Sequence, residues 1–174
     1  MSKIPCGAKQ EIEMTLMQRI DTKTRPAVIR PARWGDKDAL LEMIHALARF
    51  NGDEPELDLP ALIDLLNADL PWIRILVAER DGVLEGYAAL VAGIQLQHGK
   101  KVMDLHHLFI RDHVRGEGLG RHLIDASRDL AERLGCARLT VSTREHNAVA
   151  QTAYRACGFA PHPFSGTRFA MELA

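Results

Sequence analysis

Three glycines at positions 116, 118 and 120 separate an apolar stretch from an amphipathic one. Residues 102–110 are rich in the apolar and β-branched side chains of a strand, and from Gly118 onward leucines recur at helical spacing. A glycine turn between a strand and a helix permits positive φ and leaves the first backbone N–H groups of the helix free to bind an anion. The turn therefore predicts an α/β fold with a phosphate site, lined by Arg115, Gly116, Glu117, Gly118, Leu119, Gly120 and Arg121.

The spacing of these glycines argues against two common nucleotide-binding turns. A Walker A loop needs a Lys-Ser or Lys-Thr pair after its last glycine, and none follows Gly120. The dinucleotide-binding fingerprint spaces its glycines as G-x-G-x-x-G, which positions 116, 118 and 120 do not match. From the glycines alone, a plain tight turn without a ligand stays open as the alternative.

The rest of the chain alternates between strand and helix patterns. Asp81-Gly82 is a two-residue hairpin turn between strands expected at 73–79 and 83–94. Asp36 can cap a helix, and Gly52 and Gly135 stand where helices should end. Further strands are expected at 27–30, 138–143 and 167–173, and further helices at 57–70 and 147–157. The patterns predict one mixed α/β domain of about six or seven strands and about four helices.

Composition limits the partners and the compartment. The chain has 174 residues and a formal net charge of -1, which gives no reason to expect nucleic acid or an anionic membrane. Its three cysteines have no C-x-x-C spacing, so we expect a reducing, cytoplasmic environment without disulfides. No apolar run approaches a membrane span.

The first 26 residues differ from the rest. Residues 1–26 are polar and are expected to be an N-terminal extension of a domain at 27–174. Ile12, Leu16 and Ile20 share one face of a possible short helix against a partner subunit, whereas a frayed extension is the plainer interpretation.

Two motifs in order resemble the GNAT superfamily of acyl-CoA N-acyltransferases. Arg115-x-x-Gly118-x-Gly120, after the strand Leu108-Phe109-Ile110, is similar to its acyl-CoA signature. A second block downstream, Asn147, Ala148, Tyr154, Gly158 and Phe159, is similar to its N-x-x-A-x-x-x-Y-x-x-x-G-F pattern, with Ala150 at or next to the usual alanine. The likeness covers residues 27–173.

The resemblance implies a mostly antiparallel central sheet, acetyl-CoA as co-substrate and no metal. The backbones of Leu108 and Ile110 would pair with the amide arm of the co-substrate, and an N–H of Leu108 or Phe109 would stabilise the oxyanion. Residues 116–121 would hold the pyrophosphate, and Asn147 the pantetheine arm. Tyr154 would protonate the departing thiolate.

Within the superfamily the chain most resembles diamine (spermidine/spermine-type) acetyltransferases, through residues 47–50 and Gly99-Lys100. It differs from them at His106-His107, where those enzymes usually carry a Glu-Asp pair. Strand alternation predicts that the two histidines lie on opposite faces. Imidazole titrates near neutral pH, so we expect His106 first, and His107 second, to be the general base.

We therefore expect an N-acetyltransferase that acts on a primary amine of a small molecule. A protein or peptide acetyltransferase and a non-catalytic acyl-CoA sensor stay open as alternatives. Asp53, Glu54, Glu56 and Asp58 lie where the family has its acceptor loop and could attract a cationic amine, or form a solvated acidic loop. The resemblance also implies a possible homodimer.

Overall fold

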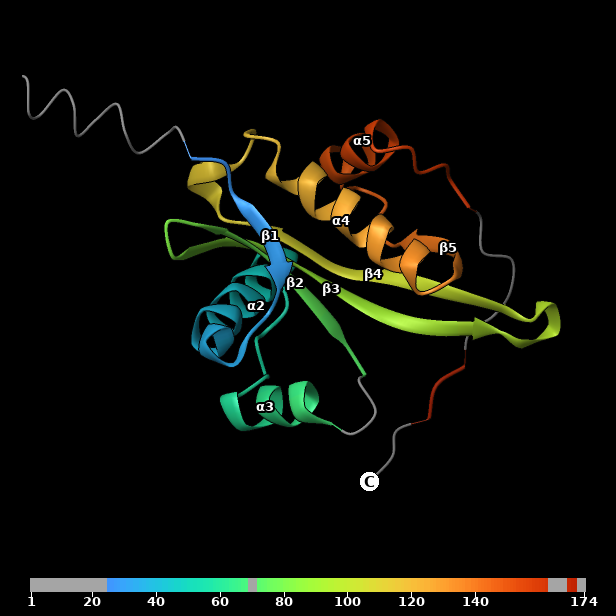
Figure 1. Ribbon diagram of the computed structural model, residues 1–174, viewed down its shortest axis with the longest axis horizontal. Helices are drawn as coiled ribbons and strands as arrows, with labels where there is room; N and C mark the ends of the chain where they lie inside the picture. The colour runs from blue at the N-terminus through green and yellow to red at the C-terminus, as the bar shows by residue number, and fades with distance from the viewer. Residues whose placement is uncertain (1–24, 69–71, 163–168, 172–174) are drawn as a thin grey trace, which may run out of the picture. The chain divides into compact units, whose positions relative to one another are not determined.

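The computed structural model describes residues 25–68, 72–162 and 169–171 (Figure 1). The chain divides into two compact units, Met1–Ser142 and Thr143–Ala174, and each is described on its own. The stretch expected to form a helix near residues 11–20 lies outside the described residues.

A five-stranded sheet in the order β1-β2-β3-β4-β5 forms the centre of the first unit (Figure 1). Neighbouring strands are antiparallel except for the parallel pair β4 and β5. The mixed, mostly antiparallel sheet is confirmed, with five strands in the described residues in place of six or seven. Residues 169–171 of the expected last strand are irregular, and its other residues are not described. The strands are β1 (Val28–Pro31), β2 (Arg74–Arg80), β3 (Val83–Gln95), β4 (Lys100–Ile110) and β5 (Cys136–Val141).

Two long helices cover opposite faces of this sheet. Helix α2 (Lys37–Asn51) packs Leu40 and Met43 against Val77 and Tyr87, all fully buried. The alternate side chains of β2, such as Leu76, point to the other face, where α4 (Leu119–Arg133) lies. Helix α3 (Leu59–Asn67) adds Leu62 to the α2 side, and α5 (Ala148–Ala156) belongs to the second unit. Short 3₁₀ turns are η2 (Trp34–Asp36), η3 (Leu96–His98) and η4 (Asp112–Val114).

Local turn chemistry explains where these elements begin and end. Asp81 and Gly82 have φ of 50° and 80°, the left-handed pair that a two-residue hairpin turn requires. Gly52, with φ of 80°, ends α2. Both positions are as predicted from the sequence.

Asp36 occupies the cap position of α2 but uses its carboxylate differently from the expectation. It makes no side-chain cap bond to α2 and instead accepts hydrogen bonds from the Arg30 guanidinium at 2.6 Å and the Arg33 N–H at 2.6 Å. The bond from Arg30 holds the pKa of Asp36 below its usual value. Asp36 therefore ties β1 to the start of α2.

Candidate active site

In the described part of the first unit, the outer edge of β4 has a strand partner over its first half only. Strand β5 pairs with β4 from Lys101 to Leu105, and within the described residues of the first unit no strand continues along His106 to Ile110. The Arg111 N–H donates to Glu85 of β3 at 2.9 Å. Because backbone groups alternate sides along a strand, we infer that Phe109 also faces β3, whereas the N–H and C=O of Leu108 and Ile110 face the open edge. Two residues of β4 can therefore pair with an extended amide-bearing ligand.

The glycine turn follows directly at the end of this edge. Gly116 and Gly118 both have φ of 85°, and Gly118 is the N-cap residue of α4. The first intrahelical bond runs from the His122 N–H to the Gly118 carbonyl at 3.1 Å. The backbone N–H groups of Leu119, Gly120 and Arg121 precede it, so they point out of the helix end where an anion binds.

The charged side chains of the turn make different contacts. Arg115 turns back toward β4, where its Nε donates to the Ile110 carbonyl at 3.1 Å and its guanidinium lies 5.4 Å from the Phe50 ring centroid. The Glu117 carboxylate accepts a hydrogen bond from Arg80 at 2.8 Å and so ties the turn to the end of β2. Arg121 is exposed on the first turn of α4. The backbone N–H groups at the start of α4 can thus bind an anion, and Arg121 adds exposed positive charge beside them.

The two histidines lie on the same face of β4, so the expectation of opposite faces is wrong. Ala89 pairs with His107, and the next residue of β3, Leu90, pairs with Leu105, so His106 is the extra residue of a β-bulge. A bulge interrupts the strict alternation of side chains. As a result the two imidazole rings stack, with centroids 4.7 Å apart and planes at 13°.

Neighbouring polar side chains differ between the two histidines. His107 Nδ1 lies 3.0 Å from the Tyr87 hydroxyl, and burial, with the nearby His106, lowers the pKa of His107. Burial raises the pKa of Tyr87, which is fully buried. His106 is more exposed, and its Nδ1 lies 3.9 Å from the carboxylate of Asp104.

In the second unit, Asn147 is the N-cap of α5. Its side-chain oxygen accepts the Ala150 N–H at 3.0 Å, which satisfies one donor of the first turn. Tyr154, on the same helix, packs edge-on against Phe159 with ring centroids 5.8 Å apart. Burial, and secondarily Cys157, raises the pKa of Tyr154, so its phenol keeps its proton at neutral pH.

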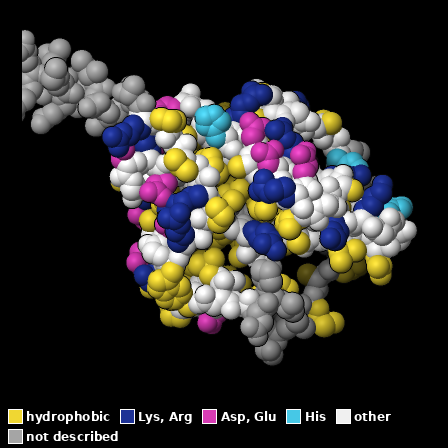
Figure 2. Space-filling view, viewed as in Figure 1, with side chains coloured by type: hydrophobic (Ala, Val, Ile, Leu, Met, Phe, Trp, Pro, Cys, Tyr) yellow, Lys and Arg dark blue, Asp and Glu magenta, His cyan; other side chains and the backbone are white. Residues whose placement is uncertain are grey.

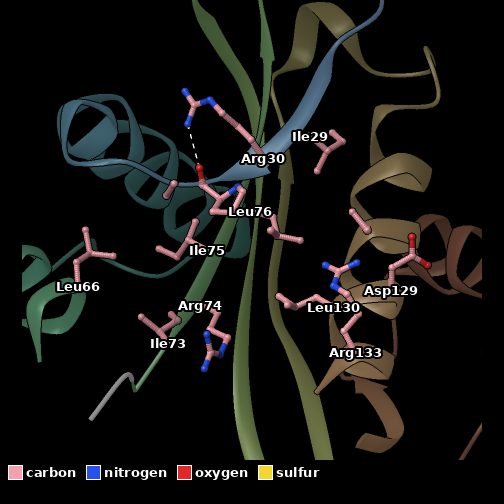
Figure 3. Close-up of a pocket in the computed structure, with 13 residues that line it drawn as sticks. Ile29, Arg30, Leu66, Ile73, Arg74, Ile75, Leu76, Asp129, Leu130 and Arg133 are labelled. Atoms are coloured by element: carbon pink, nitrogen blue, oxygen red, sulfur yellow. Dashed lines mark hydrogen bonds between the residues drawn. The ribbon is translucent and has the colours of Figure 1, made fainter. Parts of the chain in front are cut away.

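Two of the cavities on the described part of the first unit lie near the elements named above. One of about 450 Å³ lies between the end of α2 and the end of β4, beside Phe109 and Arg115. The other, of about 470 Å³, lies where β1 and β2 face α4 (Figure 3). Its lining includes the apolar Leu76 and Leu130 and the cationic Arg74 and Arg133 (Figure 3). Apolar side chains and Lys or Arg side chains also gather side by side on this face in the space-filling view (Figure 2). Neither the histidines nor residues 116–121 line the larger cavity.

Two further features bear on the kind of protein. Among the described residues, no group of three or more His, Cys, Asp or Glu side chains is arranged to hold a metal ion. In the same part of the chain, no helix is both long and apolar enough to cross a membrane.

Comparison with known proteins agrees with this geometry. Residues 39–159 match the model of the acetyltransferase (GNAT) family. The chain belongs to this family. The IAA acetyltransferase of Azospirillum brasilense is 31% identical over 124 residues, which is 71% of this chain and 78% of that protein. The thialysine N-epsilon-acetyltransferase of Bos taurus is 25% identical over 75% of this chain and 82% of its own length.

A solved GNAT-type structure supports the same fold. The aminoglycoside N-acetyltransferase AAC(6')-Iy in complex with CoA superimposes with a TM-score of 0.69 at 20% identity, and the match covers 84% of this chain and 97% of that one. Membership in the family makes the protein an acyl-CoA-dependent N-acetyltransferase with acetyl-CoA as co-substrate.

Three polar residues beside the histidines of this acetyltransferase escaped the sequence analysis. Asp104 stands two residues before His106, so alternation along the strand could have placed both on one face. Tyr87 and Thr140 come from other strands, and only the pairing of β3 and β5 with β4 brings them there.

Proposed function

We propose that this acetyltransferase transfers the acetyl group of acetyl-CoA to a primary amine of a small molecule by direct attack. The observation that carries the proposal is the open edge of β4, which runs from the stacked histidines to the glycine turn. An acyl donor lying along this edge would place its thioester beside His106 and its pyrophosphate at the start of α4.

The co-substrate site would consist mainly of backbone. Leu108 and Ile110 would pair with the amide arm, and residues 116–121 would bind the pyrophosphate through N–H groups. Leu108 is the better oxyanion donor, because its N–H faces the open edge whereas that of Phe109 faces β3. Asn147 would add a contact to the pantetheine arm.

The chemical step needs a base and an acid. The amine nitrogen attacks the thioester carbonyl carbon, and the oxyanion accepts the Leu108 N–H. His106 takes the proton from the nitrogen, the C–S bond breaks, and Tyr154 donates its phenolic proton to the departing thiolate. The products are an acetamide and coenzyme A.

The names of two sequence relatives support a small acceptor, since one refers to IAA and the other to the ε-amine of thialysine. A diamine is a further candidate, because the acidic residues Asp53, Glu54, Glu56 and Asp58 follow α2 and would attract a cation. We also propose a homodimer in the cytoplasm, which light scattering of the purified chain and localisation of a tagged copy would test.

A thiol-release assay with acetyl-CoA tests the proposed function. The panel holds polyamines, amino acids, aminoglycosides and peptides. We expect turnover with at least one class of free small amine. Acetylation of peptides alone would favour a protein acetyltransferase, and tight binding of coenzyme A without turnover would favour a sensor.

A further inference from the structure

We propose that Asp104 and Thr140 are positioning residues that direct His106 to take the proton, whereas Tyr87 holds His107 as a neutral ring beneath it. This inference rests on the proposed function, because it names the residues that would make its general base work. The same arrangement makes His106, and not His107, the general base.

Thr140 holds the carboxylate of Asp104 in place. Strand register pairs Asp104 with Thr140 across the parallel β4–β5 ladder, so both side chains lie on the same face. The Thr140 hydroxyl donates to Asp104 Oδ1 at 2.8 Å, and its longer contact to the Met103 carbonyl is 3.3 Å. One carboxylate oxygen is therefore engaged, and the other remains for the imidazole.

Asp104 Oδ2 is that other oxygen, and it lies 3.9 Å from His106 Nδ1. The two atoms must approach to hydrogen-bond distance for this role, and catalytic hydrogen bonds that are long without substrate often tighten when it binds. A proton on Nδ1 that points to the carboxylate leaves the lone pair on Nε2. With 56% of its side chain exposed, His106 can present that lone pair to an incoming amine.

His107 differs from His106 because its Nδ1 contacts a hydroxyl group and not a carboxylate. The buried Tyr87 hydroxyl keeps its proton and lies 3.0 Å from His107 Nδ1, so it can donate to that nitrogen. We infer from this bond that neutral His107 carries its proton on Nε2, which leaves neither nitrogen free to accept one. Burial disfavours its charged form as well.

Other charged or titratable groups lie on α2 and just after β4, and Arg138, two residues before Thr140 on β5, lies on the same face as Thr140. Glu42 is paired with Arg111 at 2.8 Å, and His45 Nε2 donates to the Leu57 carbonyl at 2.6 Å. Arg49 lies near Glu42 and favours its charged form. Since Glu42 is already engaged, Asp104 is the carboxylate placed to stabilise a charged His106.

The stacked rings then work as a unit with one proton. A charge on His106 disfavours a charge on His107, and the carboxylate of Asp104 favours the charge on His106. The proton taken from the amine therefore stays on the exposed ring, from which water can remove it.

Kinetic pH profiles of variants test the assignment. Asp104→Asn should lower kcat/KM for the amine roughly 10- to 100-fold, with most of the loss in kcat, and should move the limb on which the rate rises with pH. Thr140→Val should also lower kcat/KM for the amine, but less than Asp104→Asn does. Tyr87→Phe should lower kcat/KM by less than about threefold, since His107 is not the base.

Asp125→Asn is the matched control, because Asp125 is a partly exposed carboxylate paired with Arg128 on α4, and its kinetics should equal those of the wild type. Equal kinetics of Asp104→Asn and wild type would overturn the proposal. So would a Tyr87→Phe loss as large as that of Asp104→Asn.

Histidine-ring NMR of the full chain separates this proposal from the proposed function. Loss of the Asp104 carboxylate should lower the fraction of neutral His106 that carries its proton on Nδ1 in Asp104→Asn, and leave the tautomer of His107 unchanged, because Tyr87 still contacts its Nδ1. This measurement needs no turnover. A changed His106 tautomer without acetyl transfer on any amine would refute the proposed function alone, whereas an unchanged tautomer would refute the role of Asp104.

Discussion

At the residue scale, the co-substrate site depends on backbone conformations that few side chains tolerate. Gly118 combines a φ of 85° with the N-cap position of α4, so a β-carbon there would strain the helix start. A substitution should therefore disturb the N–H groups that face the pyrophosphate.

We predict that Gly118→Ala raises KM for acetyl-CoA about tenfold, because strain moves the anion-binding N–H groups, and costs about 1 kcal/mol of stability. Steady-state kinetics and urea unfolding measure both effects. Gly135→Ala is the matched control, since Gly135 has a φ of 73° just past the other end of α4. It should cost similar stability and leave KM unchanged. A similar rise in KM for both variants would contradict the prediction.

Tyr154→Phe should lower kcat roughly 10- to 100-fold with little change in KM, since it removes only the proton donor. Burial raises the pKa of Tyr154, so its phenol remains protonated at a higher pH than an ordinary tyrosine. Any loss of wild-type rate from Tyr154 ionisation should therefore begin above about pH 10. A pH series of kcat for both proteins checks this, and an unchanged kcat in the variant would exclude the role.

At the element scale, the position of β4 depends on a close approach to β3. Gly86 pairs with Ile110, and a β-carbon on Gly86 would lie 2.6 Å from the Phe109 carbonyl oxygen. A backbone oxygen cannot move unless the strand moves with it. The end of β4 can therefore lie this close to β3 only because residue 86 has no side chain.

Gly86→Ala should therefore lower the free energy of unfolding by about 1 to 3 kcal/mol and weaken acetyl-CoA binding, because it displaces the end of β4. Gly93→Ala on the same strand is the control, since its β-carbon would meet a side-chain methyl group of Val102 at 3.1 Å and no backbone atom within 4 Å. Thermal unfolding and calorimetric titration with coenzyme A compare the two. Equal losses of stability and of coenzyme A affinity in the two variants would contradict the view that Gly86 allows the close approach of β4 to β3.

At the scale of the whole molecule, the proposed boundary places residues 1–26 outside the acetyltransferase domain. Strand β1 begins at Val28, and the family match spans residues 39–159. Arg25 contacts Asp81 through an exposed ion pair of 3.2 Å, a kind of contact that contributes little to stability.

Deletion of residues 1–26 should therefore change the free energy of unfolding by less than about 1 kcal/mol and leave thiol release intact. Urea unfolding and the acetyl-CoA assay on the shortened chain measure this. A large loss in either would place part of the extension within the domain, and a change of molar mass in light scattering would assign it to an interface.

The sequence by itself determined the features that arise from short-range chemistry. The positive φ at Asp81-Gly82 and Gly52, the leucine face of α4 and the glycine turn follow from residues close together in the chain. Only the tertiary structure decided which side chains meet at β4. The bulge at His106 depends on register with β3, and the contact between Asp104 and Thr140 depends on pairing with β5. Such pairings join residues distant in sequence, which local periodicity does not encode.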